Sequence, residues 1–215
     1  MMAEALHFAI FAAVKRHEPV DPAGVTAAAW AALTDEALMS RYMAGEEAAF
    51  AALFARHTGR LYGYFTHRTG SRAQAEDLTQ QTWLRVHHAR QRFQVEARFL
   101  PWLYTIAANL GRSSARAHAR EHLTADGALP EEQALPQDLQ EPGLSESHRA
   151  VRQALLSLPE GQREVILLHR FQGLDFAEIA AALGISEGAV KLRAHRGYQQ
   201  LRVLLDVSTA PKEKP

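Results

Sequence analysis

The fold of this chain is decided by one stretch near its C-terminus, Phe176–Arg202, which reads FAEIAAALGISEGAVKLRAHRGYQQLR. Its apolar spacing predicts a short helix over 176–183 and a longer one over 187–205. Gly184 stands between them, where a sharp turn favours a positive φ, and Ser186 is suited to cap the second helix. Helix, glycine turn and helix form the helix-turn-helix pattern.

The second helix of this motif has two different faces. Val190, Ala194, Gly197 and Leu201 recur at helical spacing and form a small or apolar face that can pack inward. A cationic helix displayed on a compact helical unit can enter the major groove of DNA. The alternative is a helical hairpin with a solvated basic face. The coincidence of turn, cap, packing face and charge favours DNA binding. The basic face contains Lys191, Arg193, His195, Arg196 and Arg202.

Formal net charge is zero over the 215 residues, but the charges are segregated along the chain. Residues 34–120 contain 12 basic and 7 acidic side chains, and residues 148–205 contain 8 and 5. Residues 121–147 contain 7 acidic side chains and no Lys or Arg. Two basic blocks separated by an acidic one are compatible with a nucleic-acid partner, which the average alone would argue against.

Composition predicts an all-α fold of two small helical domains. The 39 alanines outnumber the 25 Val, Ile and Thr residues combined, which favours helices over strands. The absence of cysteine excludes disulfides, thiolate metal sites and thiol nucleophiles. Broken helical patterns and charge give the predicted boundaries. These are an N-terminal extension (1–33), a first domain (34–120), a flexible acidic linker (121–147), a helix-turn-helix domain (148–205) and a tail (206–215).

A second basic block, residues 90–120, contains six arginines against a single acid, Glu96. Arg112, Arg116 and Arg120 repeat every four residues, which places them on one helix face. Four aromatic residues lie between the arginines in sequence: Phe93, Phe99, Trp102 and Tyr104. In a nucleic-acid interface the arginines would contact phosphates, and the aromatic rings would stack on unpaired bases. The alternative is that the interleaved aromatic residues are core and the arginines are merely solvated.

Other signals point away from membranes, metals and catalysis. The apolar stretch Leu6–Val14 has its cations after it, the reverse of a secretory signal, so we expect a cytoplasmic protein. His118 and His122 share a helical spacing, but no third ligand is evident nearby, so we expect neither metal nor cofactor. We expect no enzymatic activity, since no phosphate-binding loop or hydrolase motif is present.

Three stretches give the chain a family resemblance: AEDLTQQTWLRVH (75–87), FLPWLYTIAANL (99–110) and the segment from Leu158 to Arg202. Together they resemble the extracytoplasmic-function (ECF) sigma factors of the bacterial sigma-70 family. The resemblance implies a subunit that directs core RNA polymerase to promoters, melts DNA and starts transcription. It also implies an anti-sigma factor as a partner, which is frequently membrane-bound in this family.

The resemblance assigns roles to specific residues. The helix that docks on a coiled coil of the polymerase β′ subunit would present Asp77, Gln80, Gln81, Trp83 and Leu84. Contacts with the minus-ten element would come from Arg92, Phe93, Arg98, Phe99, Trp102, Tyr104, Asn109, Arg112 and Arg116. The minus-thirty-five element would be recognised by Ser186, Glu187, Lys191, Leu192, Arg193, His195 and Arg196.

The sequence departs from the family pattern at several of these places. Ala108 and Ser113 replace an arginine and an acid near the minus-ten residues, which puts the minus-ten preference in doubt. Leu192 stands where serine is frequent in the recognition helix. Gln81 and Trp83 replace the usual glutamate and phenylalanine of the docking helix.

Two other functions are compatible with the residues. A free-standing helix-turn-helix regulator would bind duplex DNA alone and would need a dimerisation or effector domain, for which no clear segment is present. An adaptor that binds polymerase but has lost promoter recognition is favoured by the departures at Ala108, Ser113 and Leu192. In the family, the connection between the two domains threads near the active-site channel and RNA exit path of core polymerase, whose β′ and β subunits are the expected partners. The acidic linker is therefore either a mimic of nucleic acid in these channels or a solvated tether.

Overall fold

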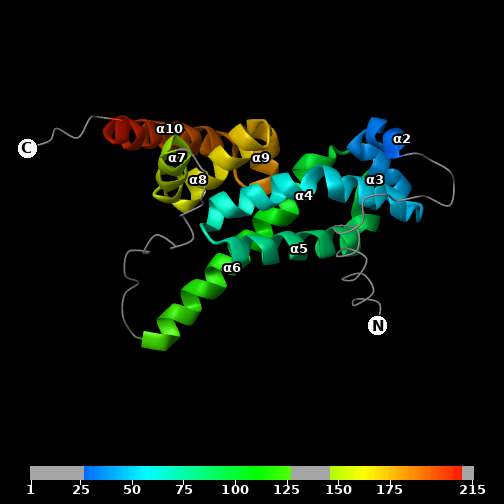
Figure 1. Cartoon of the computed structure of the whole chain (residues 1–215), viewed down its shortest axis with the longest axis horizontal. Helices are drawn as coiled ribbons and strands as arrows, with labels where there is room; N and C mark the ends of the chain where they lie inside the picture. The colour runs from blue at the N-terminus through cyan, green and yellow to red at the C-terminus, as the bar shows by residue number, and fades with distance from the viewer. Residues whose placement is uncertain (1–26, 127–145, 210–215) are drawn as a thin grey trace, which may run out of the picture.

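The computed structural model describes residues 27–126 and 146–209, and within these ranges every regular element is a helix (Figure 1). The predicted all-α fold is therefore confirmed for this part of the chain. The N-terminal half contains α2 (Ala27–Ala32), α3 (Asp35–Met43), α4 (Glu47–Thr69), α5 (Arg72–Ala89), the short 3-10 helix η1 (Arg90–Arg92) and α6 (Phe99–Asp126). The C-terminal half contains α7 (Glu146–Leu156), α8 (Glu160–Ile166), the π-helical turn η3 (Leu167–Phe171), α9 (Phe176–Leu183) and α10 (Glu187–Thr209).

Local chemistry explains where these helices begin and end. The hydroxyl of Ser71 accepts a hydrogen bond from the amide of Gln74 at 3.3 Å, which caps α5. Thr34 caps α3 in the same way. Helix α4 ends at Gly70, whose φ of 75° lies in the left-handed region that favours glycine.

Aromatic packing holds the first domain together. Trp83 of α5 is fully buried, and its ring lies 5.6 Å from that of Phe50 and 5.2 Å from that of Phe54, both in α4. Side chains of this size contribute several kcal/mol when they are fully buried. Helix α5 is therefore fixed by its inner face, which leaves the outer face available to partners.

The domain boundaries differ from the predicted ones. Trp30 of α2 is buried, and the guanidinium of Arg41 lies 5.4 Å from the centre of its ring, so the end of the predicted N-terminal extension is part of the first domain. Helix α6 continues to Asp126, and α7 begins at Glu146, so both ends of the predicted acidic linker are helical. The remainder of that linker, like the apolar stretch Leu6–Val14 and the tail after Thr209, lies outside the described residues.

Figure 1 shows helices α8 to α10 lying against α4 and the first half of α6, while the second half of α6 extends away from the body. Within the described ranges, none of the helices is both long enough and apolar enough to cross a membrane. The two halves thus form one body, in which α6 packs on α9 and α4 packs on α7, α8 and η3.

Candidate nucleic-acid interface and docking helix

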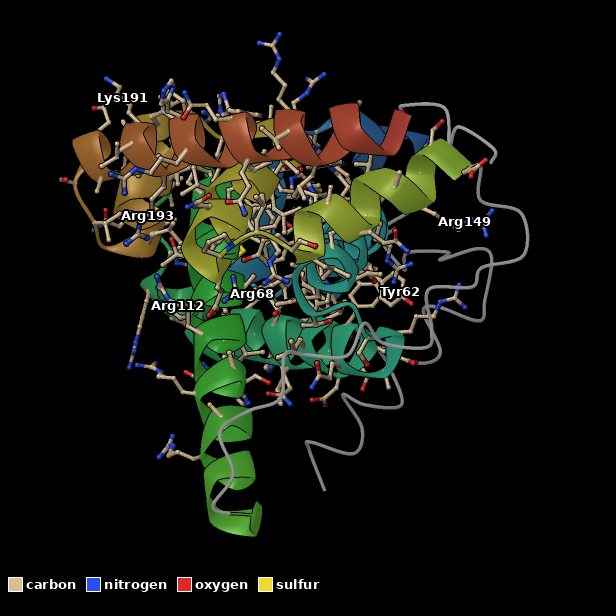
Figure 2. The ribbon with its side chains drawn as sticks, turned by 90° about the vertical axis from the view of Figure 1, so that its left-hand side faces the viewer. Tyr62, Arg68, Arg112, Arg149, Lys191 and Arg193 are labelled. Atoms are coloured by element: carbon tan, nitrogen blue, oxygen red, sulfur yellow. The ribbon has the colours of Figure 1, made fainter. Side chains whose placement is uncertain are left out.

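Helix α10 presents four predicted residues together on its outer face. Lys191, Leu192, His195 and Arg196 are all exposed, and Figure 2 shows Lys191 on the side of the helix that faces away from the rest of the molecule. The ammonium of Lys191 forms an ion pair of 2.7 Å with Glu187 one turn earlier. This face of α10 is therefore exposed and cationic, with one apolar side chain, Leu192.

Two other residues predicted for this surface have different surroundings. Arg193 is partly buried and lies along α8, where a Cβ placed on Gly161 would be 3.3 Å from its Nη1. The hydroxyl of Ser186 accepts a hydrogen bond from the amide of Ala189 at 3.2 Å, so it caps α10. Both residues position the helix rather than extend its outer face.

The turn between α9 and α10 has the predicted geometry. Gly184 has a φ of 67°, and Ile179 and Val190 are buried on either side of it. A capping box starts α9: the amide of Glu178 donates to Asp175 at 2.8 Å, and the amide of Asp175 donates to Glu178 at 2.9 Å. The sequence signature of that box, Asp followed three residues later by Glu, was present but was not part of our prediction.

The aromatic residues predicted to stack on unpaired bases are mostly in the core. Phe93, Phe99 and Tyr104 have 3%, 0% and 1% of their surface exposed. Trp102 is partly exposed, and its ring packs on that of Phe93 at 5.2 Å. In this conformation Phe93 and Phe99 pack together at the two ends of the loop between η1 and α6, Tyr104 packs on Tyr64 of α4, and none of the three rings offers a stacking face.

Polar residues near the same loop line a pocket of about 330 Å³ between the end of α5 and α6. Arg92 and Asn109, both predicted for the minus-ten surface, lie in it, and Asn109 accepts a hydrogen bond of 2.6 Å from Arg112. Arg85 and His88 also line the pocket and were missed. Arg85, His88 and Arg92 follow one another at spacings of three and four residues, which is the signal that identifies one helix face.

The other residues predicted to contact the minus-ten element are not among those that line this pocket. Arg98 and Arg116 are exposed, on the loop and on the extended part of α6. Ala108, where the family has arginine, is fully buried, so no side chain reaches DNA from that position. Ser113 is exposed, and its hydroxyl donates to the carbonyl oxygen of Asn109 at 2.9 Å.

The outer face of α5 presents a polar patch with one apolar member. Asp77, Gln80 and Gln81 are exposed, and the amide of Gln81 donates to the carboxylate of Asp77 at 2.6 Å. Leu84 is 37% exposed next to them, whereas Trp83 is fully buried in the opposite direction. Four of the five predicted docking residues thus share a surface, and Trp83 supports it from beneath.

The end of α5 is tied to α3 by a hydrogen bond between the Tyr42 hydroxyl and Nδ1 of His87. Burial raises the pKa of Tyr42 to about 12, so the phenol keeps its proton. Burial and the nearby charge of Arg90 lower the pKa of His87, so the imidazole is neutral and accepts the bond at neutral pH. This contact fixes the helix end that forms the pocket.

Metal ligands do not cluster in the parts of the chain that the structure describes. Residues 27–126 and 146–209 contain no group of three or more His, Cys, Asp or Glu side chains that could hold an ion. The side chains of His118 and His122 lie outside the described set.

Comparison with known proteins gives the family. Residues 53–121 match the family described as Sigma-70 region 2, and residues 148–201 match Sigma-70, region 4. The chain is 41% identical over 169 residues to the RNA polymerase sigma factor CarQ of Myxococcus xanthus, a match that covers 78% of this chain and 95% of CarQ. It is 34% identical over 173 residues to the ECF RNA polymerase sigma factor SigL of Mycobacterium tuberculosis, covering 79% and 96% of the two chains.

A solved structure agrees with this result. The sigma factor RpoE of Bartonella quintana, crystallised with the anti-sigma factor NepR, superposes with a TM-score of 0.63 and 28% identity, covering 74% of this chain and 97% of RpoE. Sigma-70 region 2 therefore precedes region 4 along this chain, the first on helices α4 to α6 and the second on α7 to α10. The chain belongs to the ECF sigma factors of the sigma-70 family, the subunits that bind core RNA polymerase and direct it to promoter DNA.

Proposed function

We propose that three surfaces of this sigma factor divide the work of initiation. The outer face of α5, formed by Asp77, Gln80, Gln81 and Leu84, docks on the β′ subunit of core polymerase. This assignment is supported by their shared exposure and by the separate burial of Trp83. A polar patch with one apolar residue suits a partner that must bind and later leave.

The pocket between α5 and α6 receives the opened minus-ten element. Asn109 offers amide donors and an acceptor that can pair with a base edge, and Arg92 with Arg85 supplies positive charge for the backbone. Arg98, on the loop before α6, and Arg112 and Arg116, on α6, extend that charge. The buried Phe93 and Phe99 hold the loop in place, and Trp102 is the remaining partly exposed aromatic face.

The outer face of α10 reads the minus-thirty-five element as duplex DNA. Lys191 and Arg196 contact phosphates or guanine edges, and Leu192 and His195 lie between them. Their joint exposure on one helix face, after a glycine turn, is the observation that supports the proposal most strongly. Ser186, Glu187 and Arg193 fix the helix in its orientation.

We further propose a cytoplasmic location and an anti-sigma factor as regulator. The sigma factor RpoE, which resembles this chain, is in complex with one. We assign no catalytic step to the chain, because phosphodiester chemistry belongs to the polymerase. The domain division follows the helices, with α2 to α6 as the polymerase and minus-ten unit and α7 to α10 as the minus-thirty-five unit.

Two double variants test the division of labour. Asp77→Ala with Gln80→Ala is expected to lower affinity for core polymerase, measured with labelled protein, and to leave duplex binding by the α10 surface unchanged. Lys191→Ala with Arg196→Ala is expected to remove the preference for a correct minus-thirty-five element while core affinity stays. Gln153→Ala with Gln200→Ala, both exposed and outside the three surfaces, is the control. Equal loss of core affinity in both double variants would show that the helices are misassigned.

A further inference from the structure

The outer face of α10 has an apolar side chain, Leu192, at its centre. With 3.6 residues per turn, Leu192 lies almost opposite the small or apolar face of the helix that packs inward. The residue is 48% exposed. Lys191 and His195 lie to one side of it on the helix surface, and Arg196 lies to the other. A DNA duplex that contacts these cations therefore covers Leu192 as well.

The helical turn before Leu192 allows a close approach to DNA. Gly188 lies four residues earlier on the same face, and a Cβ placed on it would meet nothing within 4 Å outside its own helix. No contact inside the protein therefore requires a glycine at this position. Because Gly188 has no side chain, Leu192 is the first bulky group along the middle of the face. A recognition helix that enters the major groove in this orientation places the leucine over the base edges.

A leucine side chain discriminates between bases because it can neither donate nor accept a hydrogen bond. Adenine, guanine and cytosine present amino groups, ring nitrogens or carbonyl oxygens in the major groove, and these groups would lose water without gaining a partner. Thymine presents an apolar group there, its C5 methyl. Contact between the leucine and that methyl removes apolar surface from water on both sides. The same side chain thus favours thymine and penalises the other bases.

The residue type at position 192 makes this discrimination a property of this chain. Serine, which is frequent at this position in the ECF sigma factors, can both donate and accept and so tolerates several bases. A single exposed leucine is ordinary on a protein surface. This one, however, lies between cations on a surface that we assign to DNA, where burial against a base changes affinity.

We propose that Leu192 specifies one thymine of the minus-thirty-five element by contact with the C5 methyl group of that base. The inference rests on the proposed function of the outer face of α10 and adds the base that this face selects. Lys191 and Arg196 supply affinity through phosphates and neighbouring bases, whereas Leu192 fixes the identity of one base. The competing partner for this face is a protein surface of core polymerase.

Deoxyuridine substitution in promoter DNA tests the contact, because deoxyuridine keeps the O4 and the base pairing of thymidine and lacks only the C5 methyl. The holoenzyme, assembled from core polymerase and this chain, first selects its preferred sequence from a duplex pool with randomised minus-ten and minus-thirty-five elements. Each thymine of the selected minus-thirty-five element, on either strand, is then replaced singly. The affinity of the holoenzyme for each duplex is measured.

The comparison uses the wild type and three variants of α10. Leu192→Ser removes the apolar contact, and Leu192→Met preserves it. Val203→Ser is the matched control, because Val203 is 63% exposed on the same helix and lies about two turns beyond Arg196. Circular dichroism confirms that each variant is folded, and affinity for core polymerase is measured for all four proteins.

For the wild type, Leu192→Met and Val203→Ser, we expect one deoxyuridine position to lower affinity about three- to fivefold, as the loss of one buried methyl group predicts. Leu192→Ser should be insensitive to deoxyuridine at that position. In a repeated selection, this variant should accept more than one base there. Its selectivity at the other positions and its affinity for core polymerase should equal those of the wild type.

The inference would be overturned if no single deoxyuridine changed the affinity of the wild type, or if Leu192→Ser kept the wild-type sensitivity. Weaker binding of Leu192→Ser to core polymerase, with unchanged base selectivity, would assign this face to a protein partner instead. A minus-thirty-five preference that does not depend on any methyl group would refute this inference alone. A pool that yields no minus-thirty-five preference would refute the proposed function of α10 itself.

Discussion

Single residues set the contact between helices in the second domain, and Gly197 is the clearest case. A Cβ at this position of α10 would lie 2.6 Å from Cδ1 of Ile166 in α8, closer than packed side chains approach. The absence of a side chain therefore determines how near α10 lies to α8. The same helix contains Gly188, which has open space around its Cβ position.

This contrast gives a prediction with an internal control. Gly197→Ala is expected to lower the free energy of unfolding by about 2 kcal/mol through overpacking against Ile166. Gly188→Ala is expected to raise it by about 0.5–1 kcal/mol, because alanine favours an open helix position. Urea unfolding of both variants measures the difference, and equal effects of the same sign would contradict the packing account.

Asp35 is a second residue whose surroundings have a measurable consequence. Its carboxylate lies 2.5 Å from Arg56 and 2.8 Å from His57, at the start of α3. Burial raises the pKa of Asp35, but the hydrogen bonds and charges of His57 and Arg56 outweigh it, so the pKa lies below its ordinary value of 3.8. A depressed pKa means that the ionised form stabilises the folded protein.

That stabilisation should be present above about pH 4 and be lost as pH falls through the lower, folded-state pKa. Asp35→Asn is expected to lower the free energy of unfolding by about 2 kcal/mol at neutral pH. The difference in this free energy between variant and wild type should shrink at acid pH. Denaturant unfolding at several pH values gives the two curves. A difference in unfolding free energy that stays constant with pH would mean that the charge on Asp35 contributes nothing to stability.

At the scale of the helix, α5 separates a supporting face from a docking face. Trp83 is fully buried beneath the helix, and Leu84, its neighbour in sequence, is 37% exposed on the outer side. Trp83→Ala is expected to lower the free energy of unfolding by about 4 kcal/mol. Leu84→Ala is expected to change stability by less than about 0.5 kcal/mol but to weaken binding to core polymerase. If Leu84→Ala left core affinity unchanged, the outer face of α5 would not be the docking surface.

Sequence patterns were sufficient for some helices and not for others. Helix α9 has the predicted bounds, because apolar periodicity and Gly184 both mark its end. No sequence pattern marks the π-helical turn at Leu167–Phe171, since the periodicity of so short a stretch does not distinguish it from an ordinary helix. The burial of Phe99 and Tyr104 depends on which helices pack on them, and that information is not contained in local spacing.

At the scale of the whole molecule, the contact between the two domains was the least predictable feature. Arg68 and Glu164 are 96 positions apart, and two charged residues at that separation leave no periodic signal. The segmented net charge suggested two independent domains, whereas the structure brings them into one body through paired charges.

Promoter-dependent run-off transcription with core RNA polymerase tests the central claim most directly. Templates would carry a pool of minus-ten and minus-thirty-five sequences, with core polymerase alone as the baseline. The account predicts discrete transcripts from a subset of templates, present only when this chain is added and lost when either element is replaced. Initiation no greater than that of core polymerase alone, on every template, would contradict the claim that the chain directs polymerase to promoters.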